Sequence, residues 1–486
     1  MGPTQAQQHL ARSHAHEEDI PGTVNLQAQE GDDTALGQAL FPVPADDPND
    51  PLQWPNWKKT TILVLLSFYS FLGNSALLGP SFGISPTTAS NLISYPNLIY
   101  GFGSLLLVPA YLKFGRRPVM LVSMTMYVFG LLGASRAHSY GGLMAARLVH
   151  ALGSGVCEAL PVQLVNDIFF LHERSKRIGY YTIALCWGAT GPLYAGYMLA
   201  GGYSWRLYFY VVLAFAAALL VLSFIFVEET MYKRDTGQTS SNSSDSSDKD
   251  VGEKMNAVER LQSVPVPPRK TFRKQLGGLA FNYTFPIKIV APPYNWSPEI
   301  SGLIALGNVI GYGLAIPFTS TSDYLAARLT RKNNCIREAE MRLGVMLPAM
   351  VIGPIGLIVY GMVAQQNLHW IGYFAGVTMV DWASYFYFTF ALAYSVDSYN
   401  ANTSEMLIAI NLGKQATTFG MGFKLLDWIL ESGYANVIAG AFAVVLVLSN
   451  FALLLFMWKG KSICHFFSQT WLARTHKKTI RAVETA

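Results

Sequence analysis

Long apolar runs separated by short polar segments occupy most of the chain from residue 58 onward. Each run is close to the ~20 residues that a helix needs to cross about 30 Å of hydrocarbon. Backbone polar groups inside a bilayer must be satisfied within their own segment, so we expect these runs to be transmembrane helices. The predicted spans cover residues 58–80, 92–112, 117–136, 141–168, 179–201, 206–227, 299–320, 342–364, 369–396, 405–427 and 434–457.

Polar segments divide the spans into two groups and predict an all-α integral membrane protein. The expected organisation is a disordered tail (1–56), a first membrane half (57–227), a linker (228–276), a second membrane half (277–457) and a basic tail (458–486). The linker holds the run SSNSSDSSDKD, which is typical of chain that buries no core.

The seventh crossing is short. An even number of crossings requires a span between the linker and the loop PPYNWSPE, and only residues 277–291 are available. This segment contains Pro286 and Lys288, and a helix of its length reaches only ~22 Å. The sequence leaves three explanations open: a truncated span, a distorted span, or translated sequence lost through a missing exon.

Composition and charge agree with a membrane location. Hydrophobic residues make up 51% of the chain and charged residues 13%, about half the charged share of a soluble protein. The net charge is +5, but the basic residues lie between apolar runs, which argues against a nucleic-acid partner. These residues alternate between the two sides of the spans, so we expect the linker and both termini to be cytosolic.

Two polar loops in corresponding positions indicate an internal repeat. The loop KFGRRP, with Lys113, Gly115, Arg116 and Arg117, joins the second and third spans. The loop SDYLAARLTRK, which begins near Asp323, joins the corresponding spans of the second half. Cations of this kind hold a short turn at the cytosolic face.

Glycines and a proline interrupt the fifth span. In the segment GATGPLYAG, Gly188, Gly191 and Gly196 allow close approach of a neighbouring helix. Pro192 removes a backbone donor and is expected to kink the helix near Gly188. The kink is interpreted as a hinge, with ordinary helix packing as the alternative.

Ionisable residues within predicted spans are costly and usually functional, and four of them are candidates for a functional role. Arg147 and Glu158 share one face of the fourth span and are candidates for a substrate or proton pathway; the alternative is that Glu158 only pairs with another polar helix. Asp381 and Lys414 lie mid-span in adjacent helices and are expected to form an ion pair, either structural or switching during transport.

These features resemble the major facilitator superfamily, and in particular the fungal drug:proton antiporters with twelve spans. The resemblance covers roughly residues 46–460. Lys113, Gly115, Arg116 and Arg117 match the interhelix signature of the family, whereas Leu112 replaces its acidic residue. The corresponding acid of the second half is kept. Arg147 of the fourth span and the segment GATGPLYAG also match family motifs.

The resemblance implies a major facilitator fold of two six-helix halves that works by alternating access. It implies a monomer in the plasma membrane that exports a small organic molecule in exchange for protons. Uptake of an organic cation or nutrient, and a non-transporting, receptor-like or inactive member, remain alternatives. The flanking family matches resume abruptly at Ala291, which favours loss or truncation of the seventh span.

Other chemistries find no support in the sequence. It contains no Walker loop, Rossmann fingerprint, GxSxG or zinc motif, so no enzyme activity, cofactor or metal is predicted. Asn295, in the sequence NWS, is the one glycosylation candidate in a predicted external loop.

Overall fold

The structure is a computed structural model. It describes residues 16–17, 23–28, 34–35, 38–44, 47–73, 86–232, 294–295, 303, 305–398 and 403–468. The short seventh span predicted over 277–291 lies outside these residues, as does most of the linker.

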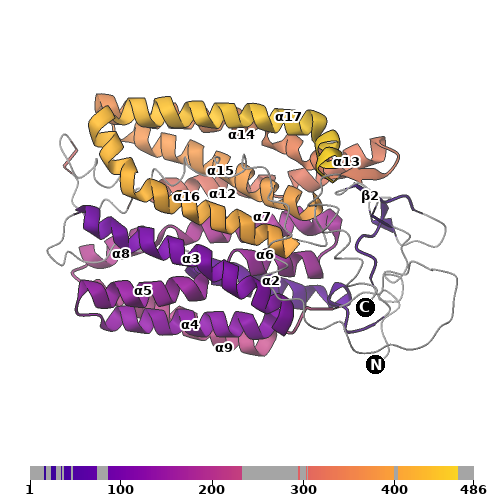
Figure 1. Cartoon of the computed structure of the whole chain (residues 1–486), viewed down its shortest axis with the longest axis horizontal. Helices are drawn as coiled ribbons and strands as arrows, with labels where there is room; N and C mark the ends of the chain where they lie inside the picture. The colour runs from indigo at the N-terminus through magenta and orange to yellow at the C-terminus, as the bar shows by residue number, and fades with distance from the viewer. Residues whose placement is uncertain are drawn as a thin grey trace.

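The first half is a group of helices aligned with the long axis of the molecule (Figure 1). The short helix η2 (Pro51–Gln53) precedes them. The helices are α2 (Asn56–Gly73), α3 (Pro86–Phe114), α4 (Arg116–Arg136), α5 (Tyr140–Ser154), α6 (Ala159–Ile168), α7 (Leu171–Gly188), α8 (Gly191–Ala200) and α9 (Arg206–Phe226).

The second half lies beside the first, in orange and yellow in Figure 1. Its elements are α12 (Ala305–Ala315), η5 (Ile316–Phe318), α13 (Thr321–Lys332), β5 (Ile336–Glu338), η6 (Ala339–Met346), α14 (Leu347–Gln366), α15 (Ile371–Ser398), α16 (Thr403–Ser432), η8 (Ala435–Phe442) and α17 (Ala443–Ser468). One hydrophobic core lies mainly in the first half and a second lies mainly in the other half, and each includes a few residues of the opposite half.

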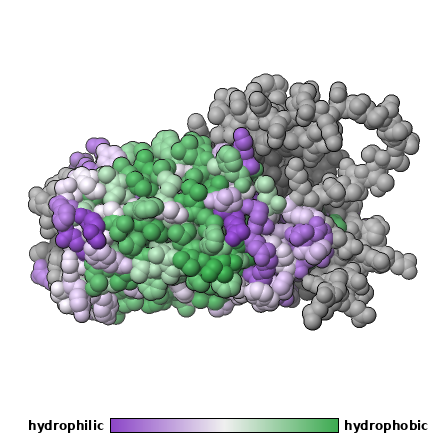
Figure 2. Space-filling model, turned by 90° about the horizontal axis from the view of Figure 1, so that it is seen from below, coloured by the Kyte–Doolittle hydropathy of each residue, from purple (hydrophilic) through white to green (hydrophobic). Residues whose placement is uncertain are grey.

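The outer surface matches a bilayer. Figure 2 shows hydrophobic residues over the middle of one face of the bundle and hydrophilic residues toward both ends. Six stretches of the described chain are long and apolar enough to cross a membrane. They are Asn91–Phe114, Arg116–Arg136, Tyr140–Ile168, Arg206–Phe226, Ala339–Gln366 and Ala435–Gly460. The predicted all-α membrane fold is confirmed.

Two predicted spans are interrupted rather than continuous. The fourth span breaks into α5 and α6, with a turn at residues 155–158. The fifth breaks into α7 and α8 at Ala189–Thr190, where the N–H groups of both residues donate to carbonyls three residues back. Pro192, the second residue of α8, supplies no N–H to continue the ladder.

Short strands form at one end of the bundle, in the tail that the sequence predicts to be disordered. They are β1 (His16–Glu17), β2 (Thr23–Asn25), β3 (Thr34–Ala35) and β4 (Gln38–Ala39). Strand β2 pairs antiparallel with β1 on one side and with β5 of the second half on the other. We call the end of the bundle that carries these strands the charged end. Gly115, Phe170, α13 and β5 also lie there.

Candidate functional site

An ion pair joins the two halves inside the bundle. Lys414 of α16 donates through Nζ to both carboxylate oxygens of Glu158, which lies in the break between α5 and α6. The two side chains are 16% and 5% exposed, so the pair is largely withdrawn from water. The ammonium group also lies 5.5 Å from the ring centroid of Phe388.

The break that presents Glu158 is supported by hydroxyl groups from neighbouring helices. The Tyr181 hydroxyl lies within hydrogen-bond distance of the carbonyls of Cys157 and Glu158, at 3.3 and 3.0 Å. The Ser70 hydroxyl donates to the Cys157 carbonyl at 2.6 Å. These donors satisfy carbonyl groups at an irregular turn that would be costly to bury unpaired.

Close packing holds the same turn against α3. A Cβ added at Gly155 would lie 2.5 Å from the backbone of Gly103, a distance that no side chain tolerates. The turn that presents Glu158 is therefore hydrogen-bonded to α2 and α7 and packed closely against α3. Arg147, the other candidate of the fourth span, is buried in α5 about two helical turns before the break.

The ion pair expected between Asp381 and Lys414 does not form. Asp381 is buried on α15, where its Cβ would lie 2.9 Å from a Cβ added at Gly311 of α12. Lys414 instead reaches Glu158 in the opposite half. The prediction is wrong because similar depth in the membrane does not place two side chains on facing surfaces.

A second polar contact between the halves lies toward the charged end. The Ser404 hydroxyl of α16 donates to the Gln163 side-chain oxygen of α6 at 3.1 Å. Gln163 in turn donates to Asp167 at 3.3 Å. Successive polar pairs thus lie along the contact between the two halves.

At the charged end, a buried guanidinium links the halves. Arg342 is fully buried and donates to Asp323 at 2.6 Å, and it also contacts Asp397. All three belong to the second half. Across the interface, Arg342 donates to the Ser175 hydroxyl and, at 3.0 Å, to the Leu171 carbonyl of the first half.

Further bonds complete this network across the interface. Asp323 accepts the backbone N–H of Lys176 at 2.8 Å, and Arg174 of α7 lies 3.5 Å from Asp397. Arg337 of β5 lies 3.9 Å from the same carboxylate. Burial and the neighbouring Arg342 lower the pKa of Arg337 to about 9. The acid predicted at the second-half loop, Asp323, is therefore part of the contact between the halves.

The first-half loop KFGRRP has no acidic residue at Leu112. Acidic residues from elsewhere in the fold take that role. Glu229, beyond α9, accepts the backbone N–H groups of Arg116 and Arg117 at 3.0 and 3.1 Å. Asp167 of α6 forms an ion pair with the Arg116 side chain. Gly115 adopts φ 97, a left-handed conformation that favours glycine and lets α4 begin directly after α3. The cationic loop is thus neutralised by acids distant in sequence.

Comparison with known proteins agrees with this architecture. Residues 60–423 match the model of the Major Facilitator Superfamily. The chain belongs to this superfamily, and it is a transporter of the major facilitator type. The predicted resemblance is confirmed.

Two fungal relatives illustrate the similarity. An MFS-type transporter of Schizosaccharomyces pombe, C1271.10c, is 24% identical over 539 residues, covering 90% of this chain and 92% of its own. Efflux pump vrtL of Penicillium aethiopicum is 26% identical over 410 residues, covering 77% and 80%. The first alignment is longer than the 486 residues of this chain, so the relative contains segments without a counterpart here.

A solved structure supports the fold alone. The proton:xylose symporter XylE, bound to 6-bromo-6-deoxy-D-glucose, superposes with a TM-score of 0.59 at 13% identity. The match covers 84% of this chain and 96% of that one. The major facilitator fold follows from this match, whereas the sugar specificity of XylE does not transfer.

The major facilitator halves also approach closely at a glycine. A Cβ added at Gly179 of α7 would lie 2.6 Å from the Tyr385 hydroxyl of α15 and 3.1 Å from a methyl group of Thr319. A side chain at this position would require the Tyr385 hydroxyl to shift. The contact lies between the two halves, so it must form and separate if they move relative to one another.

The remaining predicted residues make local contacts. Lys113 is exposed, with its ammonium 5.7 Å from the Phe114 ring. Gly188 ends α7, and Gly191 and Gly196 belong to α8, so the predicted hinge motif coincides with the helix break. Asn295 is exposed beside Tyr294, whose hydroxyl bonds to the Leu368 carbonyl at the end opposite the charged end. Among the described residues, no group of three or more His, Cys, Asp or Glu side chains gathers as a metal site.

Proposed function

We propose that this transporter exports a small organic molecule in exchange for protons. The observation that carries the proposal is the ion pair between Glu158 and Lys414, which joins the two halves within the bundle. Movement of one half against the other must break or rearrange this pair. A group that gains or loses a proton at this point therefore couples proton binding to the movement.

The physical basis is the cost of an unpaired buried charge. Protonation of Glu158 removes the negative partner of Lys414 and leaves the ammonium without its counter-ion, which destabilises the contact between the halves. Loss of that proton restores the attraction and favours the joined state. Substrate that enters between the halves acts on the same equilibrium, because it also displaces groups at this contact.

Export is favoured over import by the relatives. One similar protein is named as an efflux pump. Leu112 stands where the family signature has an acidic residue, and this difference is one reason to consider an inactive member. Glu229 and Asp167 supply acidic groups to the same loop. A transporter with an intact loop network explains the structure better than a receptor without transport.

Uptake of an organic cation is the second candidate. The carboxylate of Glu158 already holds an ammonium group, and Phe388 presents its ring to the same cation. A carboxylate beside an aromatic ring is the arrangement that binds organic cations. A positively charged substrate would then take the place of the Lys414 ammonium.

Reconstituted transport decides between these candidates. Purified protein in liposomes is loaded with a fluorescent organic cation or a neutral planar dye, and a pH gradient is imposed. We expect flux of the solute opposite to the flow of protons. Flux in the same direction as protons supports uptake instead, and flux unaffected by the gradient contradicts proton coupling.

We further propose that the charged end faces the cytosol and that the protein lies in the plasma membrane. The basic residues of the loops support this orientation. Single cysteines at Tyr324→Cys, exposed on α13, and Gln366→Cys, exposed at the opposite end, report on it. An impermeant thiol reagent applied to intact cells should label the second and not the first. Labelling of Tyr324→Cys from outside contradicts the orientation.

A further inference from the structure

The tail before α2 crosses the junction between the two halves at the charged end. Residues 23–26 and 38–41 of its described stretches lie there, and we call these two segments the strap. The Ala39 N–H donates to the Leu26 carbonyl at 3.0 Å, so the two stretches are bonded to each other. We propose that the strap is a regulatory clasp that holds the charged end of the transporter closed.

On one side the strap is bonded to the second half. In the antiparallel pair of β2 and β5, Thr23 lies opposite Glu338, Val24 opposite Arg337 and Asn25 opposite Ile336. The Leu26 N–H extends the ladder to the Cys335 carbonyl at 3.0 Å. The Gln38 side chain also donates to the Ala327 carbonyl of α13 at 3.1 Å.

On the other side the strap is attached to the first half. The Leu171 N–H, at the start of α7, donates to the Phe41 carbonyl at 2.9 Å. The Leu171 side chain is buried in one cluster with Val24, Leu26 and Ala39. The strap therefore contacts α7 of one half and α13 and β5 of the other.

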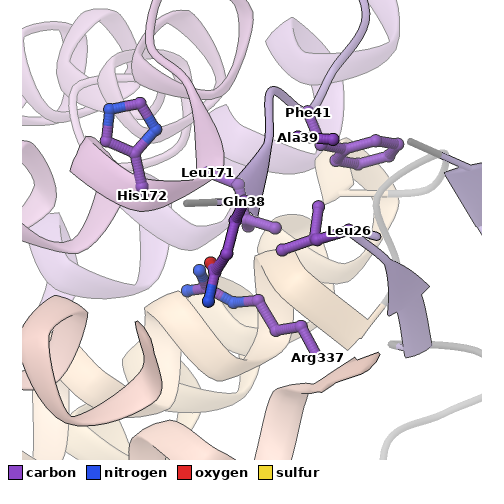
Figure 3. A pocket seen from close by; sticks show the side chains of 7 residues that line it. All are labelled: Leu26, Gln38, Ala39, Phe41, Leu171, His172 and Arg337. Atoms are coloured by element: carbon purple, nitrogen blue, oxygen red, sulfur yellow. The ribbon is translucent and has the colours of Figure 1, made fainter. Parts of the chain in front are cut away.

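Figure 3 shows how strap residues and both halves converge on a small cavity. It is lined by Leu26, Gln38, Ala39, Phe41, Leu171, His172 and Arg337 and has a volume of about 10 Å³, room for about one water molecule. The strap and both halves therefore meet around one small cavity.

The strap also covers part of the buried network formed by Arg337, Arg342, Asp323 and Asp397. Arg337 lies opposite Val24 in the antiparallel pair, and its side chain is 3% exposed and lies 3.9 Å from Asp397. Asp397 is bonded to Arg342, which reaches the first half. Excluding water from these charges strengthens their attraction. The strap thus acts on the closed state both by bridging the halves and by keeping the network dry.

Opening of the charged end requires α7 to move away from α13 and β5. The strap cannot follow both, so one set of its bonds must break before the halves separate. Weakening the strap shifts the equilibrium toward the open state. A cytosolic factor or modification that draws the tail away would have the same effect.

Distances between two spin labels, measured by double electron–electron resonance, test the proposal. Spin labels are attached at Phe114→Cys of the first half and Tyr324→Cys of the second, both exposed at the charged end, after the four native cysteines are replaced by alanine. Leu26→Pro removes the donor to Cys335 and the side chain that packs on Leu171. Ala28→Pro, at an exposed tail position, is the matched control.

In lipid nanodiscs, we expect Leu26→Pro to raise at least threefold the fraction of molecules with a long distance between the two spin labels. Ala28→Pro should leave the distribution of these distances unchanged. Gln38→Ala, which removes only the bond to α13, should give a smaller shift in the same direction. Identical distributions in all three folded proteins overturn the proposal. If Leu26→Pro does not fold, an unchanged distribution for Gln38→Ala overturns it. The readout needs no substrate, so it is independent of the proposed export.

Discussion

Glu158→Gln is expected to reduce proton-driven flux to the background of empty liposomes, while exchange of labelled for unlabelled substrate continues. Glutamine keeps the size of the side chain and its ability to contact Lys414, but it cannot release a proton at any working pH. Gradient-driven transport requires that release, whereas exchange requires only that the halves move with substrate bound. The measurement is solute flux in proteoliposomes with and without a pH gradient.

A matched variant separates the role of Glu158 from general damage. Glu228→Gln makes the same chemical change in a side chain that is 58% exposed and paired with Lys58. Exposed ion pairs contribute ~0–1 kcal/mol, so this variant should transport normally. Normal gradient-driven flux by Glu158→Gln, at unchanged pH dependence, rules out the proposed proton site.

The partner residue offers a second check. Lys414→Gln alone leaves the Glu158 carboxylate buried without its counter-ion, which typically costs about 3–5 kcal/mol. The double variant removes both charges and should recover much of that stability, but not proton-driven flux. Recovery of stability without recovery of coupling is the signature of a pair that is both structural and functional.

Arg342→Met is expected to have the largest effect on stability at the charged end. The substitution keeps an unbranched side chain but removes the guanidinium that contacts Asp323 and Asp397. Two buried carboxylates then share a site without their main cation, and breaking such a pair typically costs about 3–5 kcal/mol. The thermal unfolding midpoint of the purified protein should fall clearly, and the protein should favour separation of the halves at this end.

The control is Arg328→Met on the exposed face of α13. Surface substitutions of this kind usually change stability by less than about 0.5 kcal/mol. An unchanged unfolding midpoint for Arg342→Met, equal to that of Arg328→Met, would show that Arg174 and Arg337 neutralise the acids without it.

The two charged residues that join the halves could be identified from the sequence, because ionisable residues within apolar runs are easy to recognise. Glu158 and Lys414 stand out as ionisable residues within spans, and the structure brings them together. Their partners were not predicted correctly, since Lys414 was assigned to Asp381. Arg342 and Asp397 were overlooked, because each lies at the end of a predicted span, where a charge is ordinarily interpreted as contacting water.

The strap was missed for a different reason. Its strands are two or three residues long, too short for an alternating pattern to be distinguished from chance. The tail also contains acidic residues and prolines, which are typical of disorder. Pairing between residues 23–25 and 336–338 depends on surfaces that exist only after the helices have assembled.

The sequence by itself determined the membrane location, the two groups of spans and the family, because the length and apolar character of each helix are local properties that the bilayer selects. The tertiary structure alone decided which charges meet. Glu229 replaces the acid absent at Leu112, and Lys414 reaches Glu158 across the interface. Ion pairs depend on the rotation and breaks of packed helices, and these follow from contacts between residues far apart in the chain.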